Sequence, residues 1–536
     1  MRRLLLLLGA LPLVALAQDP DAPVDRTRLP SLTPRVFESR GTLSVSLPDI
    51  ERQPLSGFGP GPRTFEVPAD RRAVERAFVP DLDALPTVTL PAPPPPETDV
   101  FALRRFRAEA GAGANLGRYG RLDLSGTGAS GEFFVDAAYD GVDGTDGYVA
   151  FDRMEARAGG RSFAPGRLRI EGFGLVDTYT TPGDFSAFER RRRVAYGTEA
   201  GIEGVGAMLY ALSLGFEQGR LEPATSSETT TTEGRLDATA RLGALNDRLR
   251  LDAAGGLAGA GSVGSDVRYG SGGLAVAFGR EDGARLLVGA RVLAYDALAT
   301  AGNGNATSAG PIVDLSLPLG PTRRLFASND PHLGVRSLTD LTGENPFVRS
   351  NPIVVPDVVP VDARAGLELR PGPALLRAFA LARYAPTSLV FETLGGQFGE
   401  AYEEVTQYGL GADVTVAVPS GVSASAGVEI RHGEIAGGSS LPFYAPLVGR
   451  AGLQVPFADG RGRIGFGAEG ESARPADRTG TVDAPAFGRL TLDGRFDVTG
   501  PVSLVARGVR LLGEAERWPG YPEPPFTFLL GLRISR

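Results

Sequence analysis

Residues 235–253 read RLDATARLGALNDRLRLDA, and two short alternating runs in this stretch decide the fold class. The apolar side chains of the first run share one face: Leu236, Ala238, Ala240 and Leu242. The polar side chains share the other: Arg235, Asp237, Thr239 and Arg241. After a short turn at 245–247, Arg250 and Asp252 alternate with leucine and alanine in the same way. A period of two predicts strands, and two strands joined by a tight turn predict a hairpin with one apolar and one charged face.

The same alternation recurs along most of the chain. It sets Arg364 and Glu368 opposite an apolar face at 361–369, and Asp493 and Arg495 opposite another at 490–498. Further apolar faces lie at 208–216 and 526–534. The pattern fits a soluble sandwich as well as a membrane barrel, so other features must separate the two.

The composition excludes several kinds of chemistry. The 536 residues include 73 Gly, no Cys and only 2 His, and the net charge is −8. Without cysteine the chain has no disulfide, thiol nucleophile or thiolate metal site, and two histidines leave little for catalytic or metal sites. We therefore expect no cofactor and no enzymatic activity. The acidic balance also argues against nucleic acid as a partner.

The chain divides into three parts by composition. Residues 1–17 carry two arginines, an apolar run and small residues before Gln18, the pattern of a cleaved secretory signal peptide. Residues 18–100 are rich in proline, including four in a row at 93–96, and predict a largely irregular periplasmic arm or linker. Residues 101–536 hold the alternating runs, and this glycine-rich part disfavours long helices.

The lengths of the links between strands distinguish a membrane barrel from a soluble sandwich. Tight turns near Asn246, Gly372 and Ser420 alternate with longer polar links such as 218–233, 328–360, 386–402 and 433–444. Outer-membrane barrels have short periplasmic turns and long external loops. We therefore predict an all-β, transmembrane antiparallel β-barrel of about 22 strands in the outer membrane, in contact with its lipid, with both ends on the short-turn side.

One segment resembles a known family. Leu325-Phe326-Ala327-Ser328-Asn329-Asp330 leads through Asn345-Pro346 and Asn351-Pro352 to a strand at 361–371, and this arrangement resembles the barrel of TonB-dependent receptors. The resemblance implies passage of solutes across the outer membrane. Receptors of this family carry a globular plug between the signal and the barrel. Residues 18–100 lack its hydrophobic pattern, so we predict that the plug is absent.

The candidate functional residues are charged side chains of the polar faces. We predict that nine of them line the lumen: Arg235, Asp237, Arg241, Arg250, Asp252, Arg364, Glu368, Asp493 and Arg495. They make either a wetted pore or a pore blocked by ion pairs. The run Arg190, Arg191, Arg192 and Arg193 is a candidate loop patch for anions at the mouth, or a solvated loop end. His432 with Ser423 and Ser425 invites comparison with a barrel phospholipase, but no serine motif accompanies them.

Three functions remain open at this stage. The first is passage of an unknown solute, and the second is a structural or assembly role in which residues 18–100 dock periplasmic or envelope proteins. The third, a remote alternative, is an outer-membrane enzyme. The proline-rich arm either threads the lumen or is captured by a partner as an extended peptide, and we favour capture.

Overall fold

The computed structural model describes residues 102–536, apart from 115–116, 144–149, 164–165, 181–189, 205–208, 223–229, 245–247, 261–264, 280–282, 298–304, 350–351, 353, 395–396, 514–517 and 519–522. The predicted signal peptide and proline-rich arm, and with them the predicted absence of a plug, lie outside these residues.

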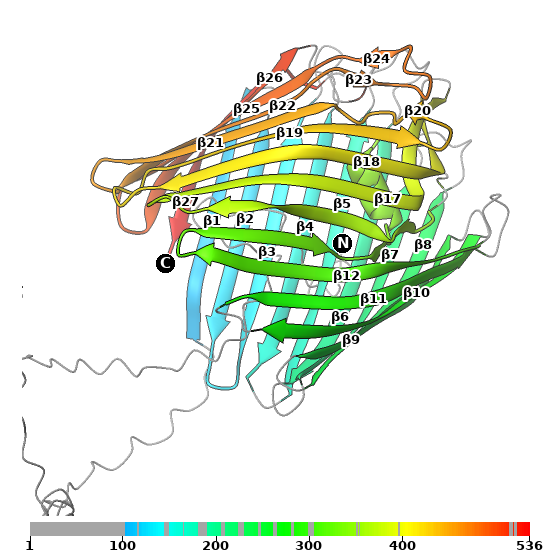
Figure 1. Ribbon diagram of the computed structural model, residues 1–536. Coiled ribbons are helices and arrows are strands. Elements are labelled where there is room, and N and C mark those ends of the chain that lie inside the picture. The colour runs from blue at the N-terminus through cyan, green and yellow to red at the C-terminus, as the bar shows by residue number, and fades with distance from the viewer. Residues whose placement is uncertain are drawn as a thin grey trace, which may run out of the picture. The chain divides into compact units, whose positions relative to one another are not determined.

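The described residues form a barrel whose wall has 22 strands (Figure 1). The wall strands are β1 (Ala102–Gly113), β2 (Arg118–Thr127), β3 (Gly131–Val142), β4 (Phe151–Ser162), β5 (Arg167–Thr180), β6 (Arg190–Gly204), β7 (Leu209–Glu222), β8 (Thr231–Ala244), β9 (Leu249–Ala260), β10 (Ser265–Gly279), β11 (Arg285–Ala297), β12 (Asn305–Gly320), β13 (Arg323–Asn329), β16 (Val361–Leu369), β17 (Ala374–Leu394), β18 (Gln397–Ala417), β19 (Ser423–Ile435), β21 (Leu447–Phe457), β22 (Gly462–Glu471), β25 (Phe487–Asp497), β26 (Val502–Gly513) and β27 (Phe526–Ser535). Short elements in the links are β14 (His332–Gly334), α2 (Leu338–Glu344), β15 (Asp357–Val359), β20 (Ser439–Ser440), β23 (Arg474–Pro475) and β24 (Asp483–Ala484).

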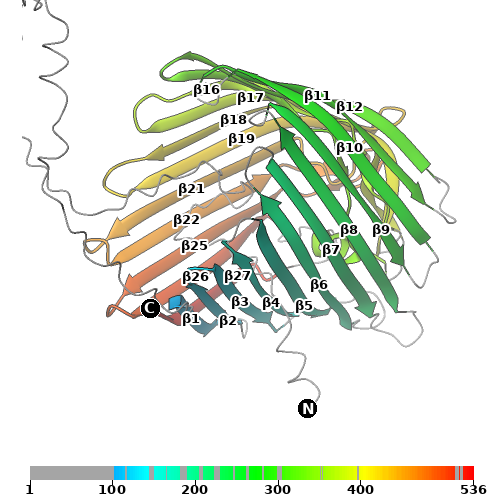
Figure 2. The same cartoon turned by 90° about the horizontal axis from the view of Figure 1, so that it is seen from below.

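The barrel is closed by pairing of its first and last strands (Figure 2). Strands β1 and β27 run antiparallel, with Glu109 opposite Arg533. Across this seam the Glu109 carboxylate accepts 2.8 Å hydrogen bonds from Arg533 Nε and Arg507 Nη2. Closure leaves no unpaired edge, which a sheet in lipid requires. The predicted antiparallel barrel of about 22 strands is confirmed.

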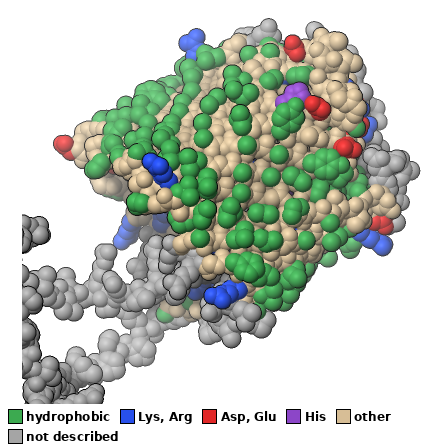
Figure 3. Space-filling model, in the orientation of Figure 1, with side chains coloured by type: hydrophobic (Ala, Val, Ile, Leu, Met, Phe, Trp, Pro, Cys, Tyr) green, Lys and Arg blue, Asp and Glu red, His purple; other side chains and the backbone are tan. Residues whose placement is uncertain are grey.

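The outer face of the wall is apolar. Leu214, Leu410 and Ile430 are 54%, 66% and 65% exposed on it, and they take alternate positions of their strands. Figure 3 shows hydrophobic side chains spread over this wall, with the few charged side chains toward its edges. Because successive side chains of a strand point to opposite faces, the charged residues of the same strands point inward.

The links divide between the two ends of the barrel as the sequence pattern predicts. Tight turns join β12 to β13, β16 to β17, β18 to β19 and β25 to β26, and the C-terminus lies at the same end. At the turn between β16 and β17, Gly372 has φ of 61°, which favours glycine. The prediction of a long polar link at 386–402 is wrong, because β17 and β18 continue to Leu394 and Gln397 as one long hairpin.

The link at 328–360 is also not an open external loop. It contains β14, α2 and β15, and it folds into the barrel at the end opposite the tight turns (Figures 1 and 2). Helix α2 begins with a capping box, since the Ser337 hydroxyl accepts from Asp340 N and the Asp340 carboxylate accepts from Ser337 N. None of the described helical residues form a helix long and apolar enough to cross a membrane.

Candidate functional site in the barrel lumen

All nine predicted lumen residues lie on the face of their strands opposite the exposed aliphatic side chains. Five of them lie on β8 and β9, in two separate sets of ion pairs. Arg235 Nε lies 2.6 Å from the Asp237 carboxylate. The Asp252 carboxylate lies 3.0 Å from Arg241 Nε and 2.8 Å from Arg250 Nε.

The other four predicted residues lie in two separate places: Arg364 and Glu368 on β16, and Asp493 and Arg495 on β25, where Asp493 stands opposite Arg507. Glu368 accepts from Arg370 and Arg377, at 2.7 and 2.9 Å, and Arg364 stacks over a neighbouring phenylalanine ring. Arg495 Nε lies 2.9 Å from an Asp497 oxygen. These side chains therefore do not meet at one point, and the charge of the inner wall is largely paired.

A row of mostly charged residues crosses the inner wall between β16 and β25, and of its charged members only Glu368 is among the residues predicted from the sequence. One residue of each neighbouring strand stands directly opposite the next: Glu368, Arg377, Asp413, Gly427, Arg450, Glu469 and Arg489. The signs alternate along the whole row. Its members occupy the inward positions of alternating runs, so the period of two could have identified them.

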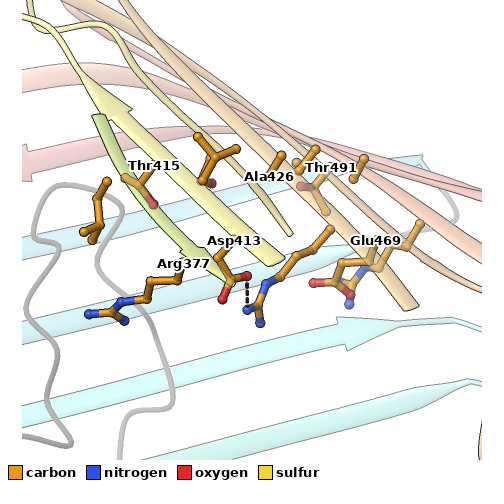
Figure 4. Close-up of a pocket in the computed structure, with 14 residues that line it drawn as sticks. Arg377, Asp413, Thr415, Ala426, Glu469 and Thr491 are labelled. Atoms are coloured by element: carbon orange, nitrogen blue, oxygen red, sulfur yellow. Dashed lines mark hydrogen bonds and ion pairs between the residues drawn. The ribbon is translucent and has the colours of Figure 1, made fainter. Parts of the chain in front are cut away.

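A cavity of about 330 Å³ lies against this row (Figure 4). The side chains of Arg377, Asp413 and Glu469 project from the same side of the sheet, and Thr415 and Thr491 add hydroxyl groups beside them. A surface with both charges and hydroxyls can hydrate or hold small polar molecules.

Glycine makes room for ion pairs that span two strands. Arg450 Nη2 lies 2.8 Å from Asp413 Oδ1, with Gly427 on the strand between them. A Cβ on Gly427 would lie 2.8 Å from Arg450 Nε, so a side chain there would displace the arginine. Gly273 has the same position between Arg291 and Asp252, whose closest atoms lie 3.3 Å apart.

The four arginines at 190–193 do not form a loop patch, and that prediction is wrong. Strand β6 begins at Arg190, so the side chains of Arg191, Arg192 and Arg193 alternate between the two faces. Arg192 is exposed outside, 3.6 Å from Glu222, whereas Arg191 and Arg193 are each only 2% exposed inside the barrel. The period of two in the strand separates charges that are adjacent in sequence.

Arg191 and Arg193 instead hold the segment that folds into the lumen. This segment, residues 330–349 and 354–360, is here called the strap. Arg193 donates to Thr339 O at 3.0 Å and to Thr342 Oγ1 at 3.2 Å, and Arg191 donates to Val348 O. Arg193 also lies 2.6 Å from the Asp177 carboxylate on β5.

Further inward-facing residues bind the strap along β8 and β11. The Glu233 carboxylate accepts from the backbone N–H of Leu338, at the start of α2. Arg291 Nη1 donates to Asp330 Oδ1 at 2.6 Å and to Pro331 O. The polar inner face of these strands is thus used to hold a part of the chain itself.

The far end of the strap is fixed at Asp357, which is only 1% exposed. Its carboxylate lies 2.7 Å from Arg336 Nη1 and 3.5 Å from Arg383 Nη2, and it accepts from Leu389 N at 2.7 Å. Burial lowers the pKa of Arg336, but the carboxylates of Asp357 and Glu344 act in the opposite direction and leave this pKa above its ordinary value.

A hydrophobic cluster, which we call the mouth cluster, joins the strap to other links. Its buried members are Leu341, Phe347, Val348, Phe391, Phe398 and Trp518, and Phe443 packs against them. Trp518 lies between β26 and β27, and its ring centroid is 5.1 Å from that of Phe398. Three links that are distant in sequence therefore pack together at this end of the barrel.

The residues of the phospholipase comparison do not come together. His432 lies on the outer face of β19, 2.8 Å from Glu434, whereas Ser423 and Ser425 occupy inward positions of the same strand. Among the described residues, no group of three or more histidine and carboxylate side chains is arranged to hold a metal ion.

Comparison with known proteins identifies the fold. No family profile and no curated protein matches the sequence. The copper transporter OprC is 14% identical over 82% of this chain and 81% of its own, with a TM-score of 0.58. The FrpB iron transporter from Neisseria meningitidis is 10% identical over 82% of both chains, with a TM-score of 0.63. The pyoverdine outer membrane receptor FpvA from Pseudomonas aeruginosa PAO1 is 11% identical over 82% of this chain and 79% of its own, with a TM-score of 0.60.

The chain has the barrel fold of the TonB-dependent outer-membrane receptors. The resemblance found at 325–371 is thereby confirmed for the fold. At these identities the likeness concerns the fold alone, and the function is argued from the lumen.

Proposed function

We propose that this chain is an outer-membrane barrel that lets small polar solutes cross through its lumen. The observation that carries the proposal is the division of the closed wall into two faces. The outer face presents aliphatic side chains as lipid requires, and the inner face carries the alternating charges between Glu368 and Arg489. A wall with an ionic inner surface is hydrated and favours polar solutes over apolar ones.

The solved neighbours support this class of function. They are a copper transporter, an iron transporter and a receptor bound to pyoverdine. The solutes of these neighbours are not assigned to this chain. Its solute is argued from the charged residues of its own lumen. The largely paired inner wall, with arginine and carboxylate neighbours, suits small neutral or zwitterionic molecules better than ions of one sign.

A liposome-swelling experiment tests the proposal. The full chain is reconstituted into vesicles, which are then diluted into isotonic solutions of small sugars or amino acids. We expect faster swelling than in protein-free vesicles, with a rate that falls as the solute becomes larger. Swelling at the protein-free rate, with a folded barrel in the vesicles, would contradict the proposal.

The two other functions remain less supported. A structural role depends on residues 18–100, which lie outside the described residues, and it is tested below by deletion. For an enzymatic role, the residues compared with a phospholipase do not come together in the described part of the chain, because His432 lies outside and the two serines face inward.

A further inference from the structure

The strap is far longer than the wall needs. Strands β13 and β16 are direct neighbours and remain paired up to Asn329 and Ala363. A short turn would therefore close this hairpin, as it does between most other wall strands. The chain instead places residues 330–360 here, with a helix and two short strands of their own.

The strap reaches far around the ring. It leaves the wall at β13 and returns at β16, yet α2 lies against β6 and β7, and β15 pairs with β17 (Figure 2). Arg191 and Arg193 of β6 hold one side of it, and Arg383 of β17 holds the other. Because these strands lie on well-separated sectors of the ring, the strap spans part of the lumen itself.

The apolar side chains of the strap are buried as completely as those of a hydrophobic core. Leu341, Val348 and Val358 are each 0% exposed, although they belong to a link between strands. Val358 lies in a second cluster with Val267 and Leu293 of the inner wall. Burial of several aliphatic side chains, together with the ion pairs at Asp357, holds the strap in one place.

The mouth cluster connects the strap to links from the other side of the barrel. Trp518 from the link between β26 and β27 and Phe443 from the link after β19 both contact Phe398 or its neighbours. The strap and the other two links are therefore packed together by this cluster at one end of the barrel.

We propose that the strap is the specificity-determining constriction of this barrel, and that it sets the largest solute that passes. The proposal rests on the proposed function, since a size limit has meaning only for a barrel that passes solutes. It assigns the size restriction to residues of one link between two wall strands.

The first test removes the strap and keeps the wall. Residues 330–360 are replaced by a short Gly- and Asn-rich turn that joins β13 to β16. In planar bilayers we expect the single-channel conductance to rise severalfold over that of the full chain, and liposome swelling to extend to larger sugars. The matched control shortens the exposed tip at 479–482, between β23 and β24, and leaves both readouts unchanged.

The second test does not depend on a deletion. Val358 and Thr387 stand directly opposite each other in an antiparallel pair, so their Cα atoms lie at a separation that a disulfide accepts. The chain has no cysteine, so Val358→Cys with Thr387→Cys introduces the only thiols. We expect the disulfide to form in the membrane-inserted protein, with the same conductance before and after reduction.

The outcomes separate this inference from the proposed function. If the strap-deleted barrel is folded and has the conductance and size limit of the full chain, the strap is not the constriction. Absence of the disulfide, or a conductance that rises on reduction, would show that the strap does not normally occupy this position. If neither the full chain nor the deleted barrel conducts, the proposed function itself fails.

Discussion

Leu214→Arg places a guanidinium on the lipid face of β7, and its cost follows from the position of the residue. Leu214 is 54% exposed, and its lateral neighbours on the same face are Ala200 and Ala238, which are too small to shield it. It lies one or two residues from the middle of Leu209–Glu222, about 5 Å along the strand at ~3.4 Å per residue. The apolar band is ~25 Å tall, so this position is well inside it.

The expected loss in free energy of unfolding is therefore about 2–4 kcal/mol, the cost of arginine near the bilayer midplane. This corresponds to a change in the folding equilibrium constant of roughly 30- to 1,000-fold. The assay is reversible denaturant unfolding in lipid vesicles, followed by the fraction of protein that migrates as a folded barrel without heating.

The matched control is Thr239→Arg, which lies one residue along the strands and faces inward. Thr239 stands opposite Ser213, and the two hydroxyl oxygens are 2.7 Å apart. A hydrated lumen accepts arginine there, so we expect a change within about 0.5 kcal/mol. Equal losses in the two variants, or a loss only in Thr239→Arg, would refute the assignment of the faces.

Three further predictions follow from the same account. Epitope tags inserted at Gly437 should be reached by antibody on intact cells, whereas tags at Ser420 should be reached only after permeabilisation; surface labelling at Ser420 would reverse the orientation. Asp357→Ala should lower the free energy of unfolding by about 3 kcal/mol in vesicle denaturation, because two partly buried arginines lose their carboxylate; a change below about 0.5 kcal/mol would contradict this. Deletion of 26–96 should leave the conductance unchanged and abolish co-purification of envelope proteins; a sharp rise in conductance would mean that the arm fills the lumen.

The wall could be predicted from the sequence because the patterns that specify its strands and turns each lie within one short segment. The alternation at 235–253 predicts both faces of a hairpin, and the structure has β8 and β9 there as an antiparallel pair. The link lengths also identify the end at which the chain terminates. These features depend on side-chain direction within one strand and on turn length, which a single segment contains.

The strap could not be predicted in the same way, because its position depends on contacts with distant strands. The bonds from Arg193 to Thr339 and Thr342 join residues that are well over one hundred positions apart. Two local signals were nevertheless present. Ser337 and Asp340 have the spacing of a capping box, and the link between β13 and β16 is unusually apolar for an external loop.

The arginines at 190–193 show a second reason why the sequence alone was insufficient. A run of four charges reads as one patch as long as the residues are placed in a loop. Once β6 begins at Arg190, neighbouring side chains point to opposite faces, and Arg192 is separated from Arg191 and Arg193 by the wall. The boundary of a strand, which is the least certain feature of a sequence, therefore decides what this cluster does.

The single-channel conductance of the full chain in a planar lipid bilayer tests the central claim most directly. We expect discrete, reproducible conductance steps from the folded barrel, smaller than an unobstructed ring of this size would give, because the strap narrows the lumen. A correctly inserted barrel that shows no steps would contradict passage through the lumen, and steps as large as those of the strap-deleted barrel would contradict the constriction.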